Sequence, residues 1–177
     1  MSRRRRALRA FAGPAALLAL ACTGCETQTR SPVAGTAVAD RIVVEKAAHR
    51  MTLFAGGRKL ATYRISLGRG GLAPKVHEGD RRTPEGDYRI TGRNPRSAYH
   101  LSLRIGYPTP AQSAQGRAAG IDPGGDIMIH GLPNGRGGMA ALFRNQDWTD
   151  GCIAVTDAEM DEIWRLTRDG AAVRILP

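Results

Sequence analysis

The sequence predicts a mainly β domain that carries one well-signalled helix. Short runs in which apolar and polar residues alternate recur between residues 41 and 176, and glycine-rich turns separate several of them. Alternation with a period of two is the pattern of a strand with one buried face. One segment near the C-terminal end has instead the start signal and the apolar spacing of an amphipathic helix.

The first predicted strands form an antiparallel meander. Residues 41–46 and 50–54 are apolar runs joined by Ala47-Ala48-His49, and Gly56-Gly57 leads into a third run at residues 59–67. Glycine turns between period-two runs are typical of hairpins. Further strands are predicted at residues 86–91, 99–105, 126–129, 152–155 and 171–176.

The predicted helix follows the strand at residues 152–155. Thr156 and Glu159 form a capping box, and Gly170 is expected to close the helix. Its apolar face, expected in the core, consists of Ala158, Met160, Ile163, Trp164 and Leu166. Residues 106–125 are predicted to be a loop, either a plain connection or a lid over a site.

The chain divides into three predicted parts. Residues 1–25 have an arginine-rich start and an apolar stretch too short to span a bilayer, which is typical of a cleaved export signal. Ala19-Leu20-Ala21 fits ordinary cleavage, whereas Thr23-Gly24-Cys25 resembles the end of a lipoprotein box, and both options stay open. Residues 26–39 read as a flexible tether and residues 40–177 as one folded domain. We therefore expect a periplasmic or cell-envelope protein, with membrane contact only through a lipid anchor.

Half of the formal net charge of +10 belongs to the leader, because residues 1–25 contain five arginines and no acids. The remaining basic excess suits an anionic partner such as a cell-wall polymer or a lipid surface. No nucleic-acid-binding motif is present, so nucleic acid is not predicted as a partner. A metal site built from Cys152, His130 and the other histidines would lack the CxxC or HExxH spacing typical of metal ligands, which argues against such a site.

Cys152 is the only cysteine beyond residue 25. In an oxidising compartment an unpaired thiol is more often reactive than a packing residue, although a buried cysteine at a strand start is the plain alternative. Gly151 lets the backbone turn sharply before it, so the amides of Gly151 and Cys152 can approach a carbonyl oxygen. The residue is a candidate nucleophile.

His130 is the candidate base for that thiol. It ends the apolar run that begins at Asp126, and Gly131 follows it. A nearby imidazolium can lower a thiol pKa to roughly 3.5–7.5, which makes the thiolate available. The plain alternative is a histidine satisfied by a backbone carbonyl. Together the two residues indicate cysteine-dependent acyl transfer.

Two motifs resemble the L,D-transpeptidase catalytic domain family, also called YkuD-like. His130-Gly131 followed by Thr149-x-Gly151-Cys152 matches its His-Gly and Ser/Thr-x-Gly-Cys signature. Residues 79–88 match its Gly-Asp-x-x-Thr-Pro-x-Gly-x-Tyr segment, whose Thr83-Pro84 reads as a turn in preference to a substrate contact. The resemblance covers roughly residues 41–176.

The resemblance implies a mixed β-sandwich or barrel in which the cysteine attacks a peptide carbonyl in a peptidoglycan stem. Cys152 would be the nucleophile and His130 the general base and acid, with the amides of Gly151 and Cys152 stabilising the oxyanion. A terminal D-alanine would leave, and an amine of a second stem would resolve the thioester. No cofactor is needed, the partners are stem peptides, and we expect a monomer.

Six further residues are candidates for substrate contact: Gly131, Arg144, Asn145, Trp148, Thr149 and Asp150. Arg144 can pair with a substrate carboxylate. Asp150 stands where many family members have histidine, and it can orient His130, meet a substrate amine or be a solvated turn residue. The stretch between His130 and Thr149 is slightly longer than is common in the family.

Two other functions compete with transpeptidation. If water resolves the thioester, the protein is an L,D-carboxypeptidase or endopeptidase with the same site. A non-catalytic cell-wall-binding lipoprotein would not need the thiol at all. The sequence does not distinguish the first of these from a transpeptidase.

Overall fold

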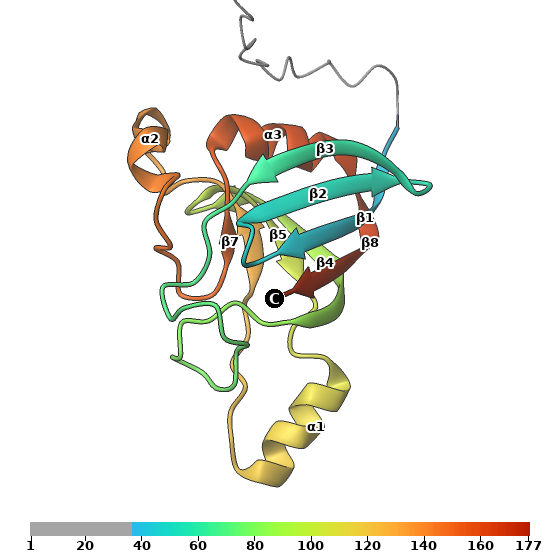
Figure 1. The fold of residues 1–177 in the computed structure, drawn as a ribbon, viewed down its shortest axis with the longest axis vertical. Coiled ribbons are helices and arrows are strands. Elements are labelled where there is room, and N and C mark those ends of the chain that lie inside the picture. The colour runs from blue at the N-terminus through green and yellow to red at the C-terminus, as the bar shows by residue number, and fades with distance from the viewer. Residues whose placement is uncertain (1–36) are drawn as a thin grey trace, which may run out of the picture. The chain divides into compact units, whose positions relative to one another are not determined.

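The computed structural model describes residues 37–177 (Figure 1). The predicted export signal at residues 1–25 and most of the tether at 26–39 lie outside the described residues. The first strand begins at Ala39, which is fully buried, so the fold starts one residue earlier than expected. Within the described part, no helix combines the length and the apolar character that a membrane crossing requires.

One curled sheet forms the body of the domain, as the mainly β prediction required (Figure 1). Its strand order is β3 (Arg58–Arg64), β2 (Arg50–Ala55), β1 (Ala39–Glu45), β8 (Thr167–Leu176), β4 (Gly86–Ser97), β5 (His100–Ile105), β6 (Met128–His130) and β7 (Ile153–Ala154). The meander β1–β2–β3 is antiparallel as predicted. β8 joins β1 in parallel and β7 joins β6 in parallel, so the sheet is mixed.

The two ends of this strand order meet. Ser66, just beyond β3, forms an isolated bridge with Ala154 of β7, and the Ser66 amide donates to the Ala154 carbonyl at 2.9 Å. The sheet therefore curls until a single bridge links its two ends, at the strand that precedes the predicted helix. A curled, nearly closed sheet holds short strands such as β6 and β7 in place, because each is paired on both sides.

Alternation explains which residues fill the core. In β1, Ile42 and Val44 are fully buried, whereas the interleaved Arg41 is exposed. The buried side chains of all the long strands join one cluster with the helix that follows β7. A single core of this kind is what a domain of this size can support.

Helix α3 (Asp157–Leu166) begins as predicted, with the Thr156 and Glu159 side chains forming a capping box. Met160 and Ile163 are fully buried, and α3 packs on β5. Two details of the prediction are wrong. Ala158 is exposed, because Glu159 occupies the buried side of the first turn. The helix ends at Leu166, since the chain enters β8 directly and Gly170 lies within that strand.

The loop predicted at residues 106–125 is also wrong in its central part. Helix α1 (Pro110–Ala119) occupies the predicted loop and projects from the sheet (Figure 1). It has a capping box from Thr109 and Gln112, proline in its first turn and Gly120 in a left-handed C-cap. Its described residues do not line the cavity discussed below.

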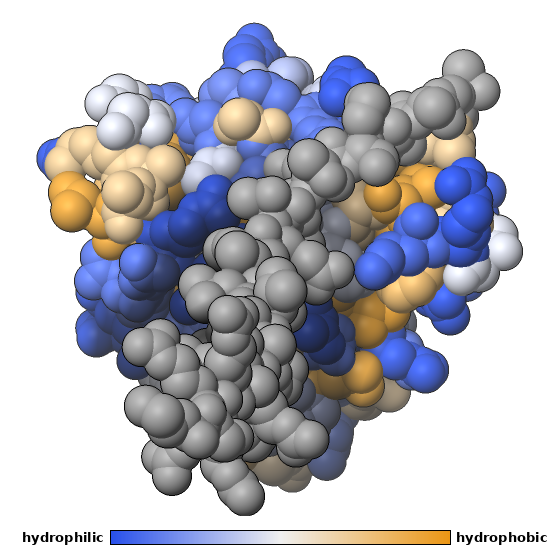
Figure 2. Space-filling view, turned by 45° about the horizontal axis from the view of Figure 1, so that its top comes forward, coloured by the Kyte–Doolittle hydropathy of each residue, from blue (hydrophilic) through white to orange (hydrophobic). Residues whose placement is uncertain are grey.

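A second projection lies between β6 and β7. It consists of the 3-10 helix η1 (Gly137–Met139) and the short helix α2 (Ala140–Phe143). Met139 and Leu142 are exposed there, and Figure 2 shows an apolar patch on the left of a largely hydrophilic face, where α2 lies. The extra length between His130 and Thr149 thus forms a separate lobe beside the sheet.

Candidate active site

Cys152 and His130 line one cavity of about 390 Å³. Its other lining residues come from β4, β5, β6 and the loops beside them: Arg69, Asn94, Ser97, Ala98, Tyr99, Ser102, Asp126, Met128, Trp148, Thr149 and Asp150. His130 ends β6, and Cys152 directly precedes β7. Because His130 pairs with Ala154 in the parallel β6–β7 ladder, the sheet itself brings the two residues together.

The His130 ring is oriented by a backbone carbonyl. Its Nδ1 lies 2.7 Å from the Gly131 carbonyl oxygen. A carbonyl can only accept, so Nδ1 carries the proton and Nε2 keeps a free lone pair. His130 is 4% exposed, and this contact is therefore made in a desolvated environment. The arrangement prepares Nε2 to accept a proton.

Aromatic rings enclose the imidazole. The ring centroids of Tyr99 and His130 are 4.6 Å apart, and those of His130 and Trp148 are 5.7 Å apart. Phe143 of α2 packs edge-on against Trp148 at 5.1 Å. Packing on both sides restricts ring rotation, which keeps the Nδ1 contact in place.

The Cys152 thiol is partly buried, and its Sγ–H donates to the Asp126 carbonyl at 3.5 Å. Burial raises the pKa of the Cys152 thiol; a backbone hydrogen bond from Met128 and the charge of Lys75 lower it, whereas the charges of Asp126 and Asp150 raise it further. The net result is a thiol that is harder to ionise than a free cysteine.

Burial also lowers the pKa of the His130 imidazole, and the bond to Gly131 opposes this shift only in part. Both shifts favour the uncharged forms. The directions of the two shifts thus run against the sequence-based expectation of a thiolate beside an imidazolium. The difference arises because desolvation acts on both groups at once.

The turn before Cys152 is fixed by Thr149. Its Oγ1 donates to the Cys152 carbonyl at 2.8 Å and accepts from the Gly151 amide at 3.2 Å. The Gly151 amide is therefore already engaged, which corrects the expectation that it faces a substrate oxygen. Thr149 is 4% exposed, and its observed contacts are internal ones. Of the two expected oxyanion donors, the Cys152 amide is the one with no hydrogen-bond acceptor among the described residues.

The family model for the L,D-transpeptidase catalytic domain, YkuD, matches residues 39–175. The chain belongs to this family. The Escherichia coli K12 protein named "Putative L,D-transpeptidase YafK" is 33% identical over 108 residues, which cover 60% of this chain and 36% of that protein.

Two solved structures have a similar fold. The helical cell shape determining protein Pgp2 of Campylobacter jejuni has a TM-score of 0.58 at 24% identity, over 76% of this chain and 46% of that one. An L,D-transpeptidase from Mycobacterium smegmatis has a TM-score of 0.51 at 15% identity, over 77% and 58% of the two chains. The chain thus spans less than half the length of YafK and of Pgp2.

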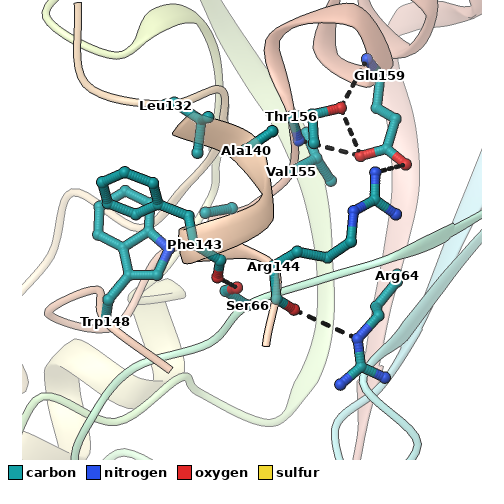
Figure 3. Close-up of a pocket in the computed structure, with 11 residues that line it drawn as sticks. Arg64, Ser66, Leu132, Ala140, Phe143, Arg144, Trp148, Val155, Thr156 and Glu159 are labelled. Atoms are coloured by element: carbon teal, nitrogen blue, oxygen red, sulfur yellow. Dashed lines mark hydrogen bonds and ion pairs between the residues drawn. The ribbon is translucent and has the colours of Figure 1, made fainter. Parts of the chain in front are cut away.

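Two expected substrate residues of this L,D-transpeptidase domain lie outside the cavity. Arg144 reaches away from it, and its Nη2 donates to Glu159 Oε1 at 3.1 Å (Figure 3). That contact places Arg144 on the α3 side, with Arg64 and Ser66. Asn145 is exposed and does not line the cavity either. Trp148 does line it, and its other face contributes to the small pocket of Figure 3.

Asp150 and Gly131 have different partners from those expected. Asp150 Oδ1 lies 2.9 Å from Arg69 Nη2 and 3.5 Å from Arg81 Nε, so it pairs with arginines and not with His130. The Gly131 amide donates to the Tyr99 carbonyl at 3.1 Å. The Gly131 backbone therefore helps to hold His130 in position, and Gly131 does not line the cavity.

The Thr-Pro segment is a structural turn. Thr83 is 1% exposed, and its Oγ1 accepts from the Gly68 amide at 3.1 Å. The fully buried Lys46 donates from Nζ to the Thr83 carbonyl at 3.1 Å and to Glu85 Oε1 at 2.8 Å. These buried hydrogen bonds thus hold the Thr83-Pro84 turn in place beside the cavity.

Sequence reasoning missed a row of polar residues across the sheet. Asn94, Ser102 and His130 occupy matching register positions on β4, β5 and β6, and all three line the cavity. Ser102 is 1% exposed, and within the described chain its Oγ has no hydrogen-bond partner. The sequence of each strand taken alone could not reveal this row, because the pairing of strands depends on residues far apart in the chain.

Among the described residues, His, Cys, Asp and Glu form no cluster that could hold a metal ion.

Gly68 was also missed, and its backbone packs closely against the turn that leads to Cys152. A Cβ at this position would overlap the Arg81 carbonyl oxygen and lie 2.9 Å from Gly151 Cα. Both obstacles are backbone, so the Gly151-Cys152 turn would have to move. We expect Gly68→Ala to lower the free energy of unfolding by about 1–3 kcal/mol and to reduce activity as well.

Thermal unfolding checks this prediction, with Gly138→Ala as the matched control. A Cβ at Gly138 would meet nothing within 4 Å, so the control should melt like the wild type. Equal melting temperatures for the two variants would contradict the prediction.

Proposed function

We propose that the domain is a cysteine-dependent L,D-transpeptidase that acts on peptidoglycan stem peptides. The observation that carries the proposal is the shared cavity, in which the Cys152 thiol lies with a histidine whose Nδ1 is held by the Gly131 carbonyl. Family membership supports the same chemistry. Pgp2, which shares the fold, is a helical cell shape determining protein, and this supports a role in the cell wall.

In the first half-reaction, His130 Nε2 takes the proton from Cys152 as the sulfur attacks a carbonyl carbon of the stem peptide. This carbonyl belongs to the diamino acid that precedes the terminal D-alanine. A carbon–sulfur bond forms, and the carbonyl oxygen becomes an oxyanion. The Cys152 amide is the donor free to stabilise that charge. His130 then returns the proton to the leaving nitrogen, D-alanine departs, and a thioester remains.

In the second half-reaction, an amine of another stem attacks the thioester. His130 removes the amine proton and returns it to the sulfur, which restores the neutral pair. Because thiol and imidazole both start uncharged, the proton moves during attack and not before it. This cycle needs no cofactor, since a thiol, a proton shuttle and an amide donor suffice.

The neutral resting pair predicts a characteristic pH dependence. The pKa of His130 is lowered, so its basic form persists to lower pH, and kcat/KM should fall only below about pH 6.5. The pKa of Cys152 is raised, so alkylation by iodoacetamide should stay slow at neutral pH and accelerate only above about pH 8.5. Rapid alkylation at about pH 6 would instead indicate a thiolate–imidazolium pair and refute the neutral mechanism.

The proposal is tested by incubating the full chain with a tetrapeptide stem and an amine acceptor. Mass spectrometry should show a transient acyl adduct on Cys152, loss of D-alanine and a cross-linked dimer. A tripeptide without dimer would assign the site to a carboxypeptidase that uses water. No adduct and no product would refute an enzymatic role and favour a wall-binding protein.

A further inference from the structure

Arg69 contributes a guanidinium to the wall of the Cys152–His130 cavity. Its side chain is 49% exposed, and its Nη2 lies 2.9 Å from Asp150 Oδ1. A guanidinium has five N–H donors, and this ion pair occupies one edge of the fork. The side chain thus combines a fixed position with donors that a ligand in the cavity can use.

The backbone around Arg69 is tied to the catalytic turn. The Arg69 amide donates to the Thr149 carbonyl at 2.9 Å, and the Thr149 amide donates to the Leu67 carbonyl at 3.2 Å. The Gly70 amide donates to the Arg81 carbonyl at 2.8 Å. Arg69 therefore lies on a segment whose backbone is hydrogen-bonded to the residues that lead to Cys152.

The local charge balance favours an anion. Asp150 is shared between Arg69 and Arg81, so two guanidiniums face one carboxylate. The other acid of the cavity wall, Asp126, is paired with Arg104 at 2.6 Å. The lining itself holds one arginine and two aspartates, but Arg81 and Arg104 stand behind those acids, so three guanidiniums balance two carboxylates around the cavity.

We propose that Arg69 binds the free carboxylate of the C-terminal residue that leaves the stem peptide. The inference rests on the proposed function. The carboxylate carbon of a terminal residue is two bonds from its peptide nitrogen, about 2.5 Å away, so its receptor must stand beside the nucleophile. Arg69 meets that requirement, because its partner Asp150 is two residues from Cys152. Arg144 does not, because it pairs with Glu159 outside the cavity.

The test compares two tetrapeptide stems, one ending in D-alanine and one ending in D-alaninamide. We expect the wild type to prefer the acid by about 10- to 100-fold in kcat/KM, the range of hydrogen bonds to a charged group. Arg69→Gln should lose this preference, because its kcat/KM for the acid should fall to about its own value for the amide. Arg69→Lys, which keeps the charge without the fork, should retain part of it.

Arg64→Gln is the matched control. It removes the same charge from the same stretch of chain, but Arg64 lines the pocket of Figure 3 and not the cavity, so the wild-type preference should remain. Melting temperatures confirm that each variant is folded.

Other outcomes separate the proposed role of Arg69 from the proposed function of the domain. If the wild type turns over the peptides and Arg69→Gln keeps the acid preference, the role of Arg69 is refuted while the proposed function stands. The diamino acid of the first two stems is diaminopimelate, whose side chain ends in a second carboxylate. A third stem, with lysine in its place, lacks that side-chain carboxylate. If the effect of Arg69→Gln disappears with this stem alone, Arg69 binds that carboxylate and the assignment to the leaving residue is refuted. No adduct and no turnover by the wild type would refute the proposed function, and this inference with it.

Discussion

Cys152→Ala is expected to abolish both the acyl adduct and turnover. The substitution removes the sulfur and leaves the cavity, the Thr149 contacts and His130 in place, so no other group can form the thioester. We expect kcat/KM to fall by at least about 10⁴-fold, as when the nucleophile of a hydrogen-bonded catalytic unit is removed. Release of D-alanine from a tetrapeptide stem measures the loss.

The adduct is located on a tryptic peptide. Cleavage after Arg144 and Arg165 gives residues 145–165, in which Cys152 is the single cysteine, so labelling of Cys22 or Cys25 cannot be mistaken for it. Cys152→Ser is the conservative control, and it should fold normally but react far more slowly, because a hydroxyl is much less acidic than a thiol. Wild-type turnover by Cys152→Ala would show that the sulfur is not the nucleophile.

The strands and the capped helix could be predicted from the sequence because their signals are local. Alternation identified β1 and β2 nearly to the residue, since Ile42 and Val44 must share a buried face. The capping box at Thr156 placed the start of α3 correctly. The pairing of β1 with β8 involves opposite ends of the domain, and no local pattern specifies it.

Helix α1 was missed although its boundaries were visible. Thr109, Pro110 and Gln112 form a readable start signal, and Gly120 a readable end. The helix between them is polar and buries a single residue, Gly116, so it lacks the apolar stripe from which a helix is usually predicted. For α1, the capping residues predict the helix better than its hydrophobic pattern does.

The residues of the site, like the elements of the fold, divide into those with a local sequence signal and those without one. The sequence identified Cys152 and His130 by residue type and by their flanking glycines, and the fold brings both to one cavity. Neighbours that come from distant segments could not be found. Arg69 is far from Cys152 along the chain, and nothing in its local sequence separates it from the other arginines. Arg144 is close in sequence but turns toward α3, because Glu159 is its partner.

The proposed mechanism, which starts from a neutral thiol and a neutral imidazole, gives His130 a larger role than an ion-pair mechanism would. With a preformed thiolate, histidine is needed mainly to protonate the leaving group. With a buried thiol of raised pKa, histidine must also remove the proton during attack. The carbonyl of Gly131 then matters twice, because it fixes the tautomer before attack and stabilises the imidazolium that attack creates.

His130→Gln is therefore expected to lower kcat/KM by about 10² to 10⁴-fold. Glutamine can fill much of the space and can donate to the Gly131 carbonyl, but it cannot accept a proton from the thiol. The remaining activity should rise with pH as Cys152 ionises without help, whereas the wild type should already have reached its plateau. The measurement is the pH profile of D-alanine release for both proteins.

His77→Gln is the matched control for this substitution. The His77 Nδ1 also lies 2.7 Å from a backbone carbonyl, that of Glu78, but the residue is exposed and does not line the cavity. It should leave the rate and its pH profile unchanged, so a loss confined to His130→Gln assigns the effect to the cavity and not to the replacement of a histidine in general; the rise of the remaining activity with pH is what identifies the base. If His130→Gln kept the wild-type rate near neutral pH, the thiol would be ionising by another route, and the general-base role of His130 would have to be abandoned.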